Sequence, residues 1–185
     1  MRKNFGAQSW LYPMPVLLVG TYDEAGKADL MNAAWGGIYE TNQVVLSLSH
    51  SHKTTKNIQA TGAFTVSIAD AKHVTEADYV GIVSANTTPD KLEKAGLHAE
   101  ASTFVKAPLF REFPMTLECK LVKFNEDGNV IGEIVNVSAD DSILDADGKI
   151  DPDKLEPIAF DSVHHTYRKL GEVVGAAFSD GKKLQ

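Results

Sequence analysis

Cysteine and positive charge are both scarce in this sequence. Its one cysteine, Cys119, excludes an internal disulfide framework and any Cys-rich zinc site. Cys119 lies in an apolar run typical of a strand, so we interpret it as a small core residue. A nucleophile would need a neighbouring base. Lys and Arg total 18 against 25 Asp and Glu, which gives a formal net charge of −7 and a pI of about 5.3. Proteins that bind the phosphate backbone are usually basic, so a nucleic-acid partner is disfavoured.

Membrane segments and several common ligand motifs are also missing. No apolar run is long enough to cross a bilayer, and Pro13 and Pro15 interrupt the place where a secretory apolar stretch would follow the basic start. We therefore expect a cytoplasmic protein without a membrane partner. The chain contains no Gly-x-Gly-x-x-Gly fingerprint for dinucleotides. In Asp145–Glu156 the Gly occupies the fourth position, whereas a calcium loop needs it at the sixth, so we interpret the segment as a solvated Asp-Gly turn.

Short β-type runs dominate what is present, and no linker or repeat divides residues 1–185 into more than one domain. Turn residues at Asp23–Lys27 and Asn125–Gly128 each separate two such runs and predict hairpins. The alternation of Phe64, Val66 and Ile68 predicts one buried face in its strand. The predicted strands are 16–22, 28–35, 43–49, 63–69, 115–124, 129–139, 157–160 and 166–170.

Helices are predicted to be few and short, at 53–61, 74–84 and 90–95. The first ends at Gly62, which suits the left-handed C-terminal position of a helix. Antiparallel strands joined by turns, with helices inserted between them, indicate a mainly β fold of the barrel type.

One stretch of this acidic chain has no acid. Thr41–Ala69 contains neither Asp nor Glu, and within it Ser49, Ser51, Lys53 and Thr54 lie where a strand ends and a helix begins. A helix N-terminus offers unpaired N–H groups and the positive end of a dipole, which suit a phosphate, and hydroxyls and Lys add further donors. An ordinary Ser/Thr-capped helix with exposed Lys is the alternative.

Two other features have a structural and a functional interpretation. The small residues of Met31–Gly37 would let the backbone approach a flat ring, with Asn32 at its polar edge. The alternative is a tight corner with Trp35 in the core. His50 and His52 share a strand face and could hold a metal with His164 or His165, but this requires distant segments to converge. Their role is therefore left open.

The order of these pieces resembles a known family. Pro13–Val16 is followed by Asn32–Trp35, then by Ser49 with Lys53–Ile58, and then by Gly62–Ser67. Further matching pieces are Asp78–Gly81, Pro89–Lys91, Gly132–Val135 and His165–Gly171. The chain resembles the flavin reductase-like family with the FMN-binding split β-barrel fold, and within it the flavoredoxin-type proteins. This resemblance implies an antiparallel, Greek-key-like barrel and FMN held at a homodimer interface.

The resemblance also implies a set of site residues. Asn32, Ala33, Ala34 and Trp35 would line the isoalloxazine ring, and Ser47, Leu48 and Ser49 would follow the ribityl chain. Lys53 and Thr54 would meet the phosphate, although many family members carry Arg where this chain has Lys53, and Lys lacks the bidentate fork. Ala85, Asn86 and Lys91 would approach the flavin from the segment after the second helix. Asn57 would anchor its helix. His165 and Tyr167 would lie where the C-terminal segment closes over the site, and for His165 we favour packing over contact with the flavin or a nicotinamide.

The resemblance implies an FMN-dependent oxidoreductase that takes hydride from NADH or NADPH and passes electrons to an acceptor that the sequence does not identify. Lys91 is the first candidate for a charge that stabilises the reduced ring; no other catalytic residue stands out. A first alternative is an electron-transfer protein of the flavoredoxin type, reduced by a redox protein partner. A second, weaker alternative is a split-barrel module that binds haem or a metal through the histidines.

Overall fold

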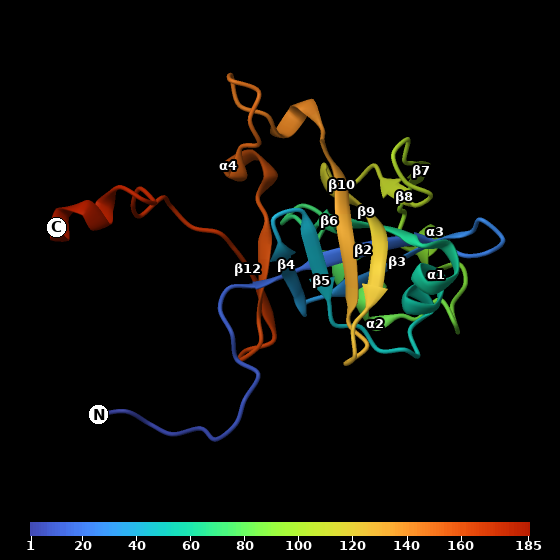
Figure 1. Ribbon diagram of the computed structural model, residues 1–185, viewed down its shortest axis with the longest axis horizontal. Helices are drawn as coiled ribbons and strands as arrows, with labels where there is room; N and C mark the ends of the chain where they lie inside the picture. The colour runs from blue at the N-terminus through green and yellow to red at the C-terminus, as the bar shows by residue number, and fades with distance from the viewer.

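The computed structural model describes residues 1–185 and is built around a curled antiparallel sheet of seven strands, in the order β3-β2-β6-β9-β10-β5-β4 (Figure 1). The strands are β2 (Leu17–Tyr22), β3 (Ala28–Ala33), β4 (Gly36–Glu40), β5 (Gln43–Leu46), β6 (Ala63–Ile68), β9 (Met115–Phe124) and β10 (Val130–Ala139).

Two small sheets and four short α-helices surround this sheet. The strands β1 (Met14–Pro15), β11 (Ile158–Asp161) and β12 (Thr166–Lys169) form one small sheet, and β7 (Ala99–Ala101) pairs with β8 (Pro108–Phe110). The helices are α1 (Lys53–Thr61), α2 (Val74–Ile82), α3 (Lys91–Lys94) and α4 (Pro152–Leu155), with 3₁₀ turns η1 (Asp141–Ile143) and η2 (Asp180–Leu184). None of the helices combines the length and the apolar composition that crossing a bilayer requires.

The strands β3 and β4 follow each other in the chain but lie at opposite ends of the sheet order. Only Ala34 and Trp35 separate them. Two residues span at most about 7 Å of extended chain, so the sheet must curl until its two edges come together. The backbone N–H of Ser47 donates to the carbonyl of Trp35 at 2.8 Å and fastens this connection to the end of β5. We call this closure, at residues 34–35, the seam of the barrel.

Every strand and helix predicted from the sequence is present, with ends shifted by three residues or fewer. Both predicted hairpins are confirmed, since β2 pairs with β3 and β9 pairs with β10. The strands β1, β4, β7 and β8 and the helix α4 were not predicted. The sequence predicts one strand over 28–35, and a corner is the alternative for Met31–Gly37. The chain instead leaves β3 at Ala33, and a new strand begins at Gly36.

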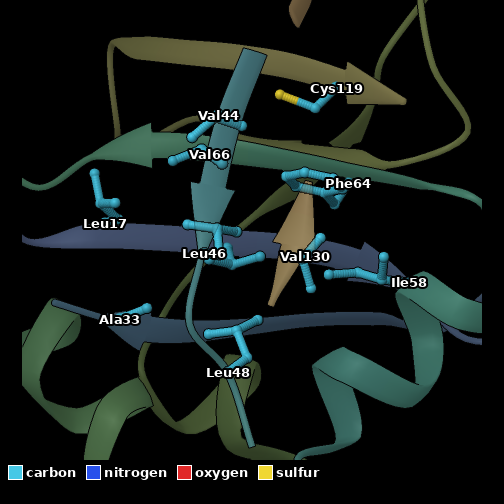
Figure 2. Packing of buried hydrophobic residues seen from close by; sticks show 11 residues of the cluster. Leu17, Ala33, Val44, Leu46, Leu48, Ile58, Phe64, Val66, Cys119 and Val130 are labelled. Atoms are coloured by element: carbon cyan, nitrogen blue, oxygen red, sulfur yellow. The ribbon is translucent and has the colours of Figure 1, made fainter. Parts of the chain in front are cut away.

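The core lies inside the curled sheet, where side chains from β2, β5 and β6 meet (Figure 2). Phe64 and Val66 are buried there and Ile68 packs against them, as the alternation predicted. The opposite face of β6 is also buried. Its hydroxyls are satisfied, because Thr65 donates to the carbonyl of Pro108 at 2.6 Å and Ser67 shares a hydrogen bond with Thr116 at 2.8 Å. A polar face therefore stays inside without unpaired groups.

Cys119 belongs to the same core cluster and is fully buried. Burial, followed by the charge of Glu118, raises the pKa of its thiol to about 12. The thiol is therefore protonated at neutral pH, and the interpretation as a core residue is confirmed.

Gly132 is a further constraint on this core, because a Cβ built on it would fall against the ring of Phe64. We predict that Gly132→Ala lowers the free energy of unfolding by about 1–3 kcal/mol, the usual effect of overpacking. Gly37→Ala is the control, since its Cβ would meet nothing within 4 Å. Thermal and urea unfolding of the two variants measure the difference. Equal stabilities would show that the Phe64 ring has room to move.

Candidate functional site

A groove that contains predicted site residues lies along the seam, since Ala34 and Trp35 belong to its lining. This groove has a volume of about 600 Å³ and is mainly apolar. Its lining includes the predicted residues Ala34, Trp35 and Ser47, together with Trp10, Leu11 and Gly37. The side chain of Trp35 is 59% exposed, so the alternative that placed Trp35 in the core is wrong. The groove thus presents a large aromatic surface and small residues to a ligand.

A second, smaller hollow of about 140 Å³ brings together predicted residues from three separate segments. Lys53 and Thr54 come from the start of α1, Ala85 from the segment after α2, and Lys91 from α3. Asn86 links the segment after α2 to the segment before α1, because its side-chain amide donates to the carbonyl of Ser51 at 3.3 Å. The sequence order therefore brings these residues together in space as the resemblance implied.

The N-terminus of α1 is open towards the second hollow. No side chain caps it, and no acidic residue lies in its first turn. The Lys53 ammonium lies 3.4 Å from a carboxylate oxygen of Asp23, in a pair that is partly exposed. The hydroxyls of Ser49 and Ser51 are 2.8 Å apart on the surface just before the helix. Unpaired N–H groups, hydroxyls and a movable ammonium form a donor set suited to a phosphate.

Thr54 and Lys91 differ from their predicted roles in where their polar ends point. The Thr54 hydroxyl donates to Oδ2 of Asp29 at 2.9 Å in a fully buried position. The Lys91 ammonium is only 3% exposed and lies 3.0 Å from Oδ1 of the same carboxylate. It also donates to the carbonyl of Val83 at 3.3 Å. Both side chains therefore support the floor of the hollow, and only the backbone N–H of Thr54 is left for a ligand.

Asp29 is the partner in this network that sequence reasoning missed. It lies in β3 and is buried, and no other acid lies in the strand. Its carboxylate ties β3 to α1 through Thr54 and to α3 through Lys91. The only sequence signal was a lone acid within an apolar strand, which indicates a partner without identifying it.

Three further predicted residues also turn their side chains away from the groove. Ala33 and Leu48 belong to the core cluster, so they can line a site only with their backbone. The Asn32 amide donates to the carbonyl of Ala77 in α2 at 3.0 Å. Asn57 is buried and donates to the hydroxyl of Thr21 at 3.0 Å, which confirms its predicted role as a helix anchor.

The histidines are distributed over different parts of the molecule. His52 lines the second hollow, and His50 lies against the hairpin at Gly128. His164 is paired with Asp161 at 2.9 Å, and the ring of His165 stacks on Phe160 at 6.4 Å between centroids. No three His, Cys, Asp or Glu side chains come together in an arrangement that would hold a metal.

Tyr167 joins the C-terminal segment to the barrel. Its ring packs against a second group of buried side chains, which includes Leu18 and Val80, and its hydroxyl donates to Asp78 of α2 at 2.7 Å. Burial, together with this hydrogen bond, raises the pKa of Tyr167 to about 12. Tyr167 thus ties the C-terminal strands to α2. His165 is exposed and stacks on Phe160 of β11, so its packing over the site stays a prediction.

Comparisons with known proteins agree with this architecture. The model of the flavin reductase like domain matches residues 9–156. Flavoredoxin of Desulfovibrio vulgaris (Miyazaki F) is 40% identical and superposes with a TM-score of 0.94, covering 98% of this chain and 100% of that one. Flavoredoxin from Methanosarcina acetivorans is 27% identical with a TM-score of 0.89 and covers 100% of both chains. A relative from Aquifex aeolicus (strain VF5) is 30% identical over 156 residues, which is 79% of each chain.

The chain belongs to the flavin reductase-like family, in its flavoredoxin-type subgroup, and its fold is the split barrel of that family. These matches support a role in flavin-related electron transfer. An apolar groove and a phosphate-type donor set that lie at the two ends of one strand, β3, suit a ligand with a flat ring and an anionic tail.

The network around Asp29 gives a testable prediction about the site. Asp29→Asn leaves the buried Lys91 ammonium without its counter-charge and is expected to lower the free energy of unfolding by about 3–5 kcal/mol. Asp23→Asn is the matched control, because it removes the charge from the partly exposed pair with Lys53 and should cost about 0–1 kcal/mol. Urea denaturation followed by circular dichroism measures both. If the two variants lose the same stability, Lys91 is not held as a buried charge.

Proposed function

We propose that this chain is an FMN-dependent oxidoreductase that takes reducing equivalents from NADH or NADPH, with the flavin bound along the seam. The observation that carries the proposal is that one strand leads from one hollow to the other. Asp29 and Met31 of β3 line the second hollow with Lys53, and the chain then runs directly into Ala34 and Trp35 of the apolar groove. A ligand with the two-part chemistry of FMN needs such an arrangement. We further propose that the protein works as a homodimer in the cytoplasm.

The residues would divide the work of binding. Trp35 and Ala34 would lie beside the isoalloxazine ring, with the backbone of Ala33 and the edge of Asn32 next to them. Ser47, Ser49 and the backbone of Leu48 would follow the ribityl chain. Lys53 and the open N-terminus of α1 would hold the phosphate. This assignment keeps the predicted residues but uses the backbone of those whose side chains are buried.

The chemistry would come mainly from the cofactor. When bound, FMN would supply the hydride and electron-transfer chemistry between a nicotinamide donor and an acceptor. The protein would position the ring, exclude water and provide charge, and it needs no general acid or base for hydride transfer. Lys91 would affect the flavin indirectly, because its ammonium is paired with Asp29 beneath the second hollow. Ala85 and Asn86 would close that hollow from the segment after α2.

A second candidate function is electron transfer without a nicotinamide, in which a redox protein reduces the bound FMN. The likeness to two flavoredoxins, at 40% and 27% identity over nearly the whole chain, favours it. The same site residues serve both functions, since both require only that FMN is bound and stays accessible at one edge.

The phosphate assignment predicts a selective loss of affinity. Lys53→Ala should weaken FMN binding by about 1–3 kcal/mol, because a charge-assisted hydrogen bond is lost, and Lys53→Arg should retain most of it. Lys56→Ala is the matched control, since this exposed lysine lies on the same helix. Fluorescence titration with FMN measures all three. Identical affinities for Lys53→Ala and Lys56→Ala would remove Lys53 from the site.

The electron donor can be identified from the absorption spectrum of the purified protein, loaded with FMN where necessary. We expect flavin bands that bleach rapidly when NADH or NADPH is added without oxygen. Bands that persist would contradict the reductase and favour the electron-transfer protein, which a reduced redox partner would then bleach. A protein that shows no flavin bands after incubation with FMN would contradict both functions.

A further inference from the structure

The C-terminal arm, residues 171–185, extends away from the barrel and exposes apolar side chains. In Figure 1 this segment, drawn in red, leaves β12 and projects away from the rest of the molecule. Val173, Val174 and Phe178 are 91%, 101% and 98% exposed, and Leu184 is 94% exposed. Monomeric proteins rarely leave such a group of large apolar side chains in water, and its presence marks an interaction site.

The arm has local structure at both of its ends. At the root, the Leu170 N–H donates to the carbonyl of Pro157 at 3.4 Å. At the tip, the carboxylate of Asp180 accepts from the Ala176 N–H at 2.8 Å and from the Lys183 ammonium at 3.0 Å. These contacts organise the tip, and no hydrogen bond or ion pair joins the tip to the barrel of its own chain. The arm is thus shaped to present Phe178 and Leu184 to something else.

Exposed apolar side chains also lie on the edge strand β4 and on the segments next to it, on the side of the barrel from which the arm leaves. We call this set the β4 face, although β4 exposes both of its sides, and define it by Trp10, Leu11, Trp35, Ile38 and Tyr39, all of which are exposed. The strand β4 lies at an edge of the sheet order, and Trp10, Leu11 and Trp35 also line the groove of the candidate site. In Figure 1 both chain termini leave the barrel on the side where β4 and β12 lie.

These two surfaces can satisfy each other in a pair of chains. Every copy carries one arm and one β4 face, so a two-fold arrangement lets each arm cover the face of the other copy and leaves no site open. The arm has two acids, Glu172 and Asp180, and two bases, Lys182 and Lys183, so it carries no net side-chain charge to another copy of a chain whose net charge is −7. Its apolar surface can then be buried without added repulsion.

We propose that the C-terminal arm of one chain crosses to a second copy and packs Val173, Val174, Phe178 and Leu184 on its β4 face. The inference builds on the proposed homodimer and identifies the segment that forms it. Since Trp35 is part of this face, the arm of one copy also covers the outer side of the FMN site of the other. The site is therefore completed only in the dimer.

The test uses the full chain with Val173→Ser, Val174→Ser and Phe178→Ser combined. These side chains are exposed within their own chain, so the fold is expected to persist. Light scattering after size exclusion should give a dimer for the unchanged chain and a monomer for the triple variant. The dissociation constant of the dimer should rise by more than about a hundredfold, because three apolar side chains lose their burial. Lys182→Ser with Lys183→Ser is the control in the same arm and should remain dimeric.

The outcomes separate this inference from the proposed function. A dimeric triple variant, or an unchanged chain that is monomeric, overturns the arm exchange whether or not FMN binds. A chain that does not bind FMN contradicts the proposed function. Its molar mass from light scattering still tests the arm exchange. Where the exchange holds, the triple variant should also release FMN more readily than the control.

A cross-link tests which chain the arm reaches. Val174→Cys and Ile38→Cys are made in separate chains, mixed and treated with a short bis-maleimide. The native Cys119 is fully buried and does not compete. We expect a covalent product that contains one chain of each kind. Its absence, with a cross-link inside a single chain of the double variant, would show that the arm folds back and would overturn the proposal.

Discussion

The two-residue connection between β3 and β4 is the constraint on which the rest of the structure depends. These strands are the edges of a seven-stranded sheet, and Ala34 and Trp35 alone join them. The sheet has to curl into a barrel to satisfy this connection, and the closure leaves a groove along the junction. Trp35 lies at this closure, is largely exposed and lines the groove. The closure of the fold and the position of the candidate flavin site therefore have the same cause.

Closure of the barrel would not by itself place the phosphate end of the site. That part depends on the carboxylate of Asp29, which is the buried partner of both Thr54 and Lys91. Because a buried charge is tolerated only when it is paired and hydrogen-bonded, α1 and α3 are fixed relative to β3 within narrow limits. The open N-terminus of α1 is thereby held against β3, the strand that leads to the seam. Because Lys91 and Asp29 neutralise each other, the more exposed Lys53 is the cation available to an anion.

Local patterns predicted much of this fold. Alternation located β6, an Asp-Gly turn located the β9–β10 hairpin, and Gly62 marked the end of α1. These signals are local, because turn chemistry and side-chain period act over a few residues. The strand β4 was missed because its identity depends on a partner that is set by the seam, and Gly36 and Gly37 have low strand propensity. The pairing of Asp29 with Lys91 was missed for a similar reason, since it joins residues that are far apart in the chain.

In the candidate site the predicted segments are present, but several of their side chains have other roles than predicted. The predicted segments did come together, but Ala33 and Leu48 use their side chains for the core, and Thr54 uses its hydroxyl for Asp29. Along much of the seam a ligand would meet backbone, and backbone groups are available whatever the side chain. The amino-acid type at these positions is then constrained by packing beneath the site more than by contact with the ligand. This explains why the order and spacing of segments carried the resemblance, while no single motif within them was decisive.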